Sequence, residues 1–289
     1  MKALIVGDLT LDLVEERKLR VGGPGYYGGW ALKLLEVEVY LLTSMSSEYR
    51  RYFNEVYAEF NIYENPCGSI PIFAIVGGRA TRVLRRGCSI PADLFKRVYR
   101  EIEPEILIFS PVLGEVKNEV LASAHAYRLA EVLSLDIQGL VREVRNDSIA
   151  NKWSPTILDL FGYVDIIHGN VREFTIKRGL NELLGILEDY SSHRNKLFLV
   201  SMDEKGLYMV YRGCSKYIPP VRVKAIDEVG AGDVLLAVTS YYKARGYNEY
   251  DATMKGVLAA SLKVAAKSKK WFNKKVLDSL DPSRIKGSS

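Results

Sequence analysis

The stretch DEVGAGD at residues 227–233 runs directly into the apolar segment VLLAV at residues 234–238, and this junction is the most informative part of the chain. Two glycines around an alanine let the backbone turn sharply where a helix begins. The first N–H groups of a helix have no intrahelical partner, and the positive end of the helix dipole lies beside them. Together these features form an anion site. The sequence therefore predicts an anion-binding turn made by Gly230, Ala231 and Gly232.

Asp233 stands in the first turn of this predicted helix, where an anion would otherwise be favoured. One interpretation is a plain helix cap. The other is a chemical participant, because a carboxylate beside an anion hole can accept the proton of a hydroxyl that attacks phosphorus. We interpret Asp233 as a general base.

The pattern Asp-x-x-Gly-Ala-Gly-Asp before an apolar helix resembles the C-terminal signature of the ribokinase-like (PfkB) family of sugar and nucleoside kinases. The resemblance implies a catalytic base at Asp233 and an anion hole for the transferred phosphoryl group at residues 230–232. The family often has Thr-Thr or Thr-Val after the first aspartate, whereas this chain has Glu228 and Val229. This departure is expected to alter local nucleotide or cation contacts.

The chain has 289 residues, of which 48% are hydrophobic and 26% are charged. That composition suits one large α/β domain, residues 1–289, better than two average ones, and gives no sign of bulk disorder. The formal charge of +5 fits anionic substrates such as nucleotides without requiring a nucleic acid. Cys67, Cys88 and Cys214 lie far apart and their number is odd, which argues against a disulfide framework or a zinc site and for a reducing compartment.

Nothing in the sequence predicts a targeting or membrane segment. The N-terminal apolar stretch is short and is cut by Asp8, and no apolar run approaches the roughly 18 residues of a membrane span. We expect a cytoplasmic protein with no membrane partner. Near the C-terminus, lysines between residues 267 and 275 are interleaved with Trp271 and Phe272. This pattern is typical of a helix with a solvated basic face and buried aromatics, so we expect no nucleic-acid partner.

Short apolar runs rich in β-forming residues alternate with longer segments of helical period. Buried strands are predicted at residues 3–6, 37–42, 106–109, 132–135, 166–168 and 197–201. Helices are predicted at residues 27–35, 47–60, 116–130, 180–190, 231–245 and 251–266. Such alternation predicts a three-layer α/β/α domain, in which helices cover both faces of a mainly parallel sheet.

Two segments depart from this alternation. Residues 11–21 alternate apolar and charged side chains, and residues 71–84 contain two short apolar runs around a Gly77-Gly78 turn. Hairpins inserted into an α/β pattern are expected to project as a small lid. The resembling family carries such a β-lid over its substrate cleft, in some members also as a dimer contact, so we expect a lid at about 11–22 and 71–86; the resemblance makes it a candidate homodimer contact and leaves the oligomeric state open. Antiparallel edge strands of the main sheet are an equal alternative.

Carboxylates follow the first predicted strand. Asp8 and Asp12 come just after it, and ligands of open parallel sheets bind beyond the carboxyl ends of the strands. Ionised carboxylates accept hydrogen bonds from hydroxyl groups, so both residues are candidate substrate ligands, with turn-capping aspartates as the alternative. The resemblance implies a contact with the acceptor sugar at Asp12.

Gly22 and Gly23 open the next predicted helix, and glycines let a chain come close to a ligand. This pair resembles the N-terminal Gly-Gly signature of the family, in which an Asn often stands four positions later to bind the sugar. Tyr27 occupies that position here. The form Gly-Gly-Pro-x-Tyr-Tyr is most similar to the archaeal myo-inositol kinase and related sugar kinase branch. A merely structural glycine turn is the alternative.

The segment DIQGLVR at residues 136–142 ends a predicted strand and resembles an Asp-x-Gln-Gly-x-x-Arg segment of the same branch. The resemblance implies that its polar groups line the cleft. Gln138 can donate to and accept from a polyol, and Arg142 can offset phosphate charge. Without the resemblance, a polar loop is the simpler interpretation.

Asn170 and Glu173 follow another predicted strand and match the Asn-x-x-Glu motif of the family. A spacing of three puts both side chains on one face of a helix. An amide and a carboxylate suit the water shell of Mg²⁺, so both residues are candidate metal ligands. A helix capping box is a compatible structural interpretation.

The segment SMDEKG at residues 201–206 resembles the Thr-x-Gly-x-x-Gly nucleotide turn of the family, with Ser201 in place of Thr and Asp203 in place of the first glycine. Gly206 preserves the close backbone approach that a phosphate or an adenine requires. The resemblance implies nucleotide contacts at these three residues and at Asn170, completed by the turn into Asp227.

Residues and resemblance together predict a ribokinase-like phosphotransferase that uses ATP and Mg²⁺ to phosphorylate a hydroxyl of a small sugar or cyclitol, such as myo-inositol. A nucleoside kinase on the same scaffold is the nearest alternative. A non-catalytic regulator that binds a sugar or a nucleotide is an alternative of a different class.

Overall fold

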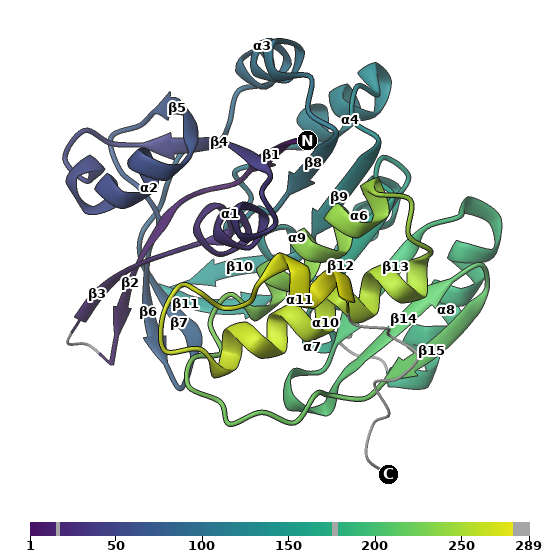
Figure 1. Cartoon of the computed structure of the whole chain (residues 1–289). Helices are drawn as coiled ribbons and strands as arrows, with labels where there is room; N and C mark the ends of the chain where they lie inside the picture. Colours follow the sequence, from purple (N-terminus) through teal and green to yellow (C-terminus); the bar gives the residue numbers. More distant parts are fainter. Residues whose placement is uncertain (16–17, 175–178, 280–289) are drawn as a thin grey trace.

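The computed structural model describes residues 1–15, 18–174 and 179–279. In these residues a sheet of nine strands forms the centre of the molecule, in the order β15-β14-β13-β12-β9-β8-β1-β4-β5 (Figure 1). Its strands are β1 (Lys2–Val6), β4 (Glu38–Met45), β5 (Asn61–Pro66), β8 (Ile106–Phe109), β9 (Val132–Asp136), β12 (Ile166–Asn170), β13 (Leu197–Ser201), β14 (Leu207–Tyr211) and β15 (Cys214–Ile218). Neighbouring strands from β13 to β5 are parallel, whereas β14 and β15 are antiparallel.

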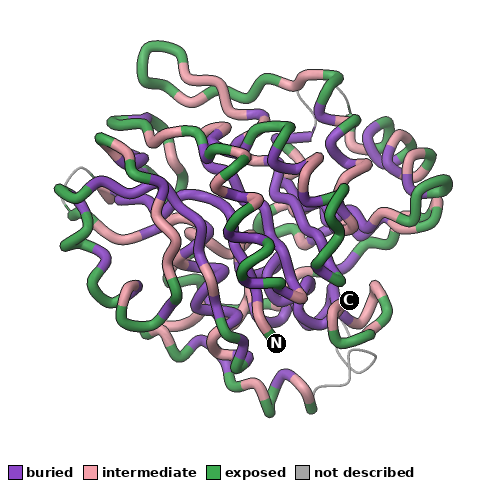
Figure 2. Tube along the Cα trace, turned by 90° about the horizontal axis from the view of Figure 1, so that it is seen from above, coloured by how far each residue is buried: buried purple, intermediate pink, exposed green. Residues whose placement is uncertain are grey.

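Helices cover both faces of this sheet, as the sequence predicted. Successive residues of β1 divide between the two apolar cores: Ala3 and Ile5 pack into one, and Leu4 and Val6 into the other. A strand buried on both faces needs an apolar residue at every position, which explains its unbroken apolar run. The first face carries α1 (Pro24–Leu34), α9 (Ala231–Ala244) and α10 (Glu249–Ala265); the second carries α3 (Ala92–Ile102), α4 (Asn118–Tyr127), α6 (Thr156–Phe161) and α8 (Leu180–Arg194). Figure 2 shows the buried backbone through the middle of the molecule and exposed segments at its periphery.

A second sheet lies beside the first and is named the lid sheet here. Its order is β10-β11-β7-β6-β2-β3. Its strands are β2 (Thr10–Val14), β3 (Lys18–Gly22), β6 (Ile72–Val76), β7 (Arg79–Arg85), β10 (Arg142–Arg145) and β11 (Ser148–Asn151). It has a small apolar core of its own, made by Phe73, Ile75, Val83 and Val112.

Both predicted lid segments lie in this separate sheet, so the alternative that placed them at the edge of the main sheet is wrong; residues 16–17 lie outside the described residues. The third hairpin, β10–β11, was not predicted. Its residues 142–151 are mostly charged or polar and carry no clear apolar alternation, so their strand pairing depends on tertiary contact with β7.

Several helices differ from their predictions. The single helix expected at residues 47–60 is a 3₁₀ turn, Arg50–Phe53, followed by the short α2 (Asn54–Glu59), and α3 was not predicted. The remaining short helices are α5 (Gln138–Val141), α7 (Val171–Phe174) and α11 (Lys274–Ser279). None of the helices in the described ranges combines the length and the apolar character needed to cross a bilayer.

Of the lysine-rich segment near the C-terminus, only its end is helical, but its aromatic residues are buried as expected. Trp271 and Phe272 belong to the apolar core that contains α1 and α9. Lys269 and Lys274 form ion pairs with Glu55 and Glu36.

One expectation about the cysteines is wrong. Cys67 and Cys88 form a disulfide, with their Cα atoms 5.9 Å apart and 21 positions apart in sequence. Cys67 follows β5 and Cys88 follows β7, so only the folded arrangement brings them together. Cys214 is exposed and free.

The disulfide is expected to stabilise the fold by restricting the unfolded chain. Replacing both Cys67 and Cys88 by Ser should lower the free energy of unfolding by about 3 kcal/mol, the value expected for a loop of this length. Urea denaturation under non-reducing conditions measures the change. Cys214→Ser is the matched control and should leave the midpoint unchanged; equal midpoints for all three proteins would contradict the prediction.

Candidate active site

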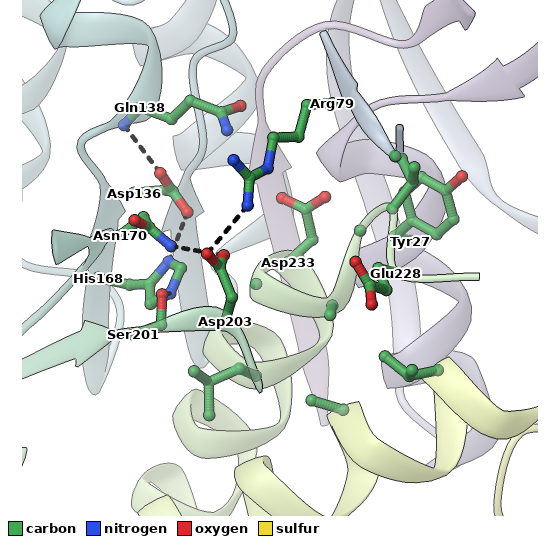
Figure 3. A pocket seen from close by; sticks show the side chains of 18 of the residues that line it. Tyr27, Arg79, Asp136, Gln138, His168, Asn170, Ser201, Asp203, Glu228 and Asp233 are labelled. Atoms are coloured by element: carbon green, nitrogen blue, oxygen red, sulfur yellow. Dashed lines mark hydrogen bonds and ion pairs between the residues drawn. The ribbon is translucent and has the colours of Figure 1, made fainter. Parts of the chain in front are cut away.

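A cavity of about 770 Å³ lies between the carboxyl ends of β9, β12 and β13, the start of α9, and the lid sheet. Most residues singled out from the sequence line it, although they come from distant parts of the chain. These are Asp12, Gly23, Tyr27, Gln138, Arg142, Asn170, Glu173, Ser201, Asp203, Gly206, Gly230, Ala231, Gly232 and Asp233. Figure 3 shows several of them around the cavity, with Asp233 opposite Asn170 and Asp203.

Three predicted ligand-binding residues lie behind the wall of the cavity. Asp8 is buried; its Oδ1 accepts a hydrogen bond from the Ser44 N–H at 2.8 Å, while Oδ2 has no partner among the described residues. Gly22 packs against the carboxylate of Asp12. Asp227 forms an ion pair with Arg20, at 3.1 Å, and lines a second, smaller pocket with it. We therefore leave these three residues out of the proposed ligand contacts.

The glycine loop before α9 has the geometry expected of an anion site. Gly230 has φ of 80°, and a Cβ atom there would come within 2.1 Å of the Tyr27 ring. A Cβ atom at Gly232 would lie 2.8 Å from the His168 ring. In the described part of the chain, the N–H groups of Gly230 and Gly232 have no hydrogen-bond partner and no side chain caps the helix. These amides are available to a ligand in the cavity, which both glycines line.

Asp233 follows in the first turn of α9 and faces the cavity. Burial and the charge of Asp136 raise its pKa to about 7, although the charges of His168, Lys263 and Arg142 act in the opposite direction. Ser110 Oγ donates a hydrogen bond to its Oδ1 at 3.5 Å. A carboxylate with this pKa is a suitable general base near neutral pH.

A buried aspartate–histidine pair beside the loop was not predicted. Asp136 Oδ2 lies 2.7 Å from His168 Nδ1, and His168 Nε2 lies 3.3 Å from Ser201 Oγ. Burial lowers the pKa of His168, but the charge and hydrogen bond of Asp136 outweigh it, so the net shift is upward. Asp136 is the first residue of the 136–142 motif, so the sequence offered a signal for it. His168 stands alone at the end of a predicted apolar strand, and no motif marks it.

One end of the cavity is rich in groups that recognise hydroxyls. Burial raises the pKa of Asp12 to about 6 against the hydrogen bond from Thr10 and the charges of Arg20 and Arg142. The Arg142 guanidinium donates to the Val112 carbonyl at 3.2 Å and lies 5.6 Å from the centre of the Phe73 ring; burial lowers its pKa. Carboxylate and guanidinium groups together can both accept from and donate to neighbouring hydroxyls.

The other end joins polar groups to an apolar wall. Asn170 Nδ2 donates to Asp203 Oδ1 at 2.9 Å, and Arg79 of the lid sheet donates to Asp203 Oδ2 at 3.1 Å (Figure 3). Arg172 also donates to Asp203. The adjacent wall is apolar and includes Leu207, Val221, Val223, Val257, Ala260 and Val264. Arg79 was not singled out from the sequence, because only the folded lid brings it to the cavity.

Glu173 and Asn170 form the local structure that the capping-box interpretation predicted. Glu173 Oε2 accepts the Asn170 N–H at 2.7 Å. Burial raises the pKa of Glu173, and the charge of Asp136 adds to the shift. Among the described residues, no cluster of three His, Cys, Asp or Glu side chains could hold a metal. Glu173 and Asn170, the two candidate metal ligands, both line the cavity, and a carboxylate with an amide suits an ion that keeps most of its waters, such as Mg²⁺.

The two departures at residues 228 and 229 face the lid. Val229 packs against the apolar core of the lid sheet, and Glu228 lines the cavity close to Gly78 in the β6–β7 turn. The loop that forms the anion site therefore contacts the lid directly.

A family model described as pfkB family carbohydrate kinase matches residues 117–270. That range contains the 136–142 motif, Asn170 and Glu173, the nucleotide turn and the glycine loop. Comparison with curated protein sequences gave no match.

Solved structures of ribokinase-family kinases superpose on most of the chain. A pyrophosphate-dependent kinase of that family, complexed with a pyrophosphate analogue and myo-inositol, gives a TM-score of 0.81 at 16% identity, covering 96% of this chain and 100% of that one. Ribokinase from Thermotoga maritima gives 0.72 at 16% identity, covering 96% and 97%. A nucleoside kinase from Methanocaldococcus jannaschii gives 0.69 at 19% identity, covering 96% of each. At these identities the likeness concerns the fold, and it confirms the ribokinase-like architecture predicted from the sequence.

Two properties of Gly230 are expected to be required: its left-handed backbone conformation and its lack of a side chain. Gly230→Ala should lower the free energy of unfolding by about 2–4 kcal/mol, since backbone strain and overpacking against Tyr27 add together. Gly246→Ala is the matched control, because Gly246 has φ of 82° but open space around its Cβ position. It should lose only about 1 kcal/mol. Equal losses in urea denaturation would contradict the contact with Tyr27 as a cause.

Proposed function

Because the chain belongs to the pfkB family of carbohydrate kinases, we propose that it transfers the γ-phosphoryl group of ATP to a hydroxyl of a small cyclitol or sugar, with Asp233 as the general base. One observation carries the proposal: the Asp233 carboxylate, with a pKa of about 7, stands in the same helical turn as N–H groups that face the cavity and have no partner in the described part of the chain.

Asp233 accepts the proton of the acceptor hydroxyl. As that O–H bond breaks, the oxygen forms a bond to the γ-phosphorus, and the bond to the β-phosphate oxygen breaks to release ADP. A base that ionises near neutral pH is matched to this task, because a substantial fraction is deprotonated there and it is still basic enough to take the proton.

The N–H groups of Gly230 and Gly232 stabilise the negative charge on the transferred phosphoryl group. They are fixed before the reaction by the left-handed turn at Gly230 and by the start of α9. Preorganised donors of this kind need no reorganisation as charge develops. Phosphoryl transfer depends mainly on such positioning and electrostatics.

Glu173, with Asn170, would hold Mg²⁺ through its water shell at the donor end of the cavity. When bound, the ion would neutralise part of the negative charge of the donor phosphates.

The acceptor end supports a polyhydroxy substrate. Asp12, Gln138 and Arg142 line it, and their acceptors and donors match a ring of adjacent hydroxyl groups. A ribokinase-family structure with bound myo-inositol, at a TM-score of 0.81, supports the cyclitol class. Phe73 and Ile75 of the lid also line this end and offer an apolar surface to a base, which keeps a nucleoside acceptor as the second candidate.

The donor end favours a nucleotide over inorganic pyrophosphate, although a pyrophosphate-dependent kinase is among the similar structures. Beyond the polar groups around Asp203, the wall formed by Val221, Val257 and Val264 is apolar. A flat purine buries against such a wall, whereas pyrophosphate has nothing to bury there.

The base assignment predicts a large loss of turnover for Asp233→Asn. The variant should lose about 10²–10⁴-fold in kcat, while ATP binding changes little. Ser110→Ala removes only the 3.5 Å hydrogen bond to Asp233 and should keep most activity. If Asp233→Asn turns over like the wild type, another group is the base.

The raised pKa of Asp233 also predicts the pH dependence of activity. The catalytic form is the carboxylate, so kcat/KM should fall as pH decreases through about 7, roughly tenfold per pH unit below it. A steady-state pH profile from 5 to 9 measures this limb. A wild-type profile that stays flat down to pH 5 would contradict the assignment.

The donor is tested by a variant in the apolar wall. Ala260→Phe fills part of the proposed purine site, so KM for ATP should rise by about tenfold or more, while any turnover with pyrophosphate stays unchanged. The assay pairs each donor with myo-inositol, simple sugars and nucleosides. Activity with pyrophosphate alone would overturn the ATP assignment, and activity with nucleosides alone would favour the second candidate.

A further inference from the structure

Lys263 is a buried lysine that the proposed mechanism does not use. It lies near the end of α10, and its side chain is 2% exposed. Its Nζ donates to the Asp227 carbonyl at 2.9 Å and to the Val229 carbonyl, and it lies 3.3 Å from Asp227 Oδ2. The ammonium also lies 4.8 Å from the centre of the Tyr27 ring. Burying an ammonium is costly unless it is paired and hydrogen-bonded, and here three oxygens surround it.

These oxygens belong to the loop that forms the anion site. Val229 directly precedes Gly230, and Asp227 lies three positions before it. The backbone N–H groups of Ile226 and Asp227 donate to the Val264 carbonyl, so the same end of α10 holds the loop through its backbone as well. Burial lowers the pKa of Lys263, and the charge and hydrogen bond of Asp227 oppose this shift.

The contact with Val229 fixes the direction of the next amide. In a trans peptide, the C=O of one residue and the N–H of the following residue point to opposite sides. The Val229 carbonyl points to Lys263, so the Gly230 N–H points away from it. Gly230 lines the cavity, and its N–H has no partner among the described residues.

We propose that Lys263 is a positioning residue, whose ammonium acts as a built-in cation that turns the carbonyls of the anion loop inward and its amides toward the bound phosphate. The two carbonyls and the carboxylate form an oxygen cage of the kind that binds a monovalent cation. Since the side chain fills this cage permanently, the protein works without added monovalent cation. The inference rests on the proposed function in one respect: phosphoryl transfer is the activity by which the conformation of the anion loop is measured.

The same helix provides a matched control. Lys255 is also 2% exposed, lies 5.6 Å from the centre of the Tyr242 ring, and donates to the carbonyls of Leu277 and Asp278. Its ammonium therefore holds the C-terminal segment and not the anion loop. Loss of a buried ammonium should destabilise the fold when either lysine is replaced. Only replacement of Lys263 should also change the anion loop.

The experiment compares Lys263→Ala with Lys255→Ala in the full-length protein. In sodium-free buffer, Lys263→Ala should lose about 10- to 100-fold in kcat/KM for ATP, since its phosphate-binding amides are no longer held in place. Titration with K⁺ or NH₄⁺ should restore part of that activity with saturation, because a free cation fills the emptied cage. Wild type and Lys255→Ala should not respond to either ion.

A thermal-shift measurement provides a readout that does not depend on kinase activity. K⁺ or NH₄⁺ should raise the Tm of Lys263→Ala and leave the Tm of Lys255→Ala unchanged, compared at equal ionic strength. A Tm response without detectable turnover would support the cage while the proposed function fails. Absence of both the activity rescue and the Tm response would overturn the proposal.

Lys263→Met keeps the test decisive if the alanine variant does not fold. Methionine retains the apolar stem and fills the cage, so this variant should lose activity and should not respond to cations. If Lys263→Met has the same kcat and the same KM for ATP as the wild type, the positioning role is overturned.

Discussion

The start of α9 sets the constraint on which the rest of the site depends. Within one turn, backbone N–H groups must stay free for an anion while the carboxylate of Asp233 faces the same cavity. Free amides near a carboxylate are compatible only if the backbone is held rigidly, since otherwise the carboxylate would cap the amides itself. Gly230 in a left-handed conformation, the Tyr27 ring against it and the cation of Lys263 behind it together supply that rigidity. The parallel sheet contributes by bringing β9, β12 and β13 to the same edge.

Acidic and basic side chains lie together in the cavity around Asp233. The charge of Asp136 raises the pKa of both Glu173 and Asp233, and the charges of His168 and Arg142 act in the opposite direction on both groups. In the proposed function, the result is a base with a pKa near neutrality beside cations and amides that can attract phosphate. Carboxylates alone would raise the pKa of the base but repel phosphate, and cations alone would attract phosphate but lower that pKa.

The sequence predicted features whose cause is local, and missed those whose cause is tertiary. The glycine loop, the strand–helix alternation and the Asn170–Glu173 cap each arise from a few adjacent residues, so their patterns are visible in the chain. The Asp136–His168 pair, the lid residue Arg79 and the β10–β11 hairpin depend on strands that meet only in the folded sheets. The disulfide was missed for the same reason, because spacing along the chain says little about two cysteines that follow β5 and β7. Asp8 illustrates what position along the chain cannot predict, since it follows β1 as expected but its side chain is buried.

The Cys67–Cys88 bond has a mechanical consequence for the lid sheet. It ties together the two ends of the segment that contains the β6–β7 hairpin, and Arg79 lies at the start of β7. Residues 67–88 thus form a closed covalent ring, whose two ends cannot separate. Any displacement of the tip at Gly77 and Gly78 therefore leaves the base of this segment joined.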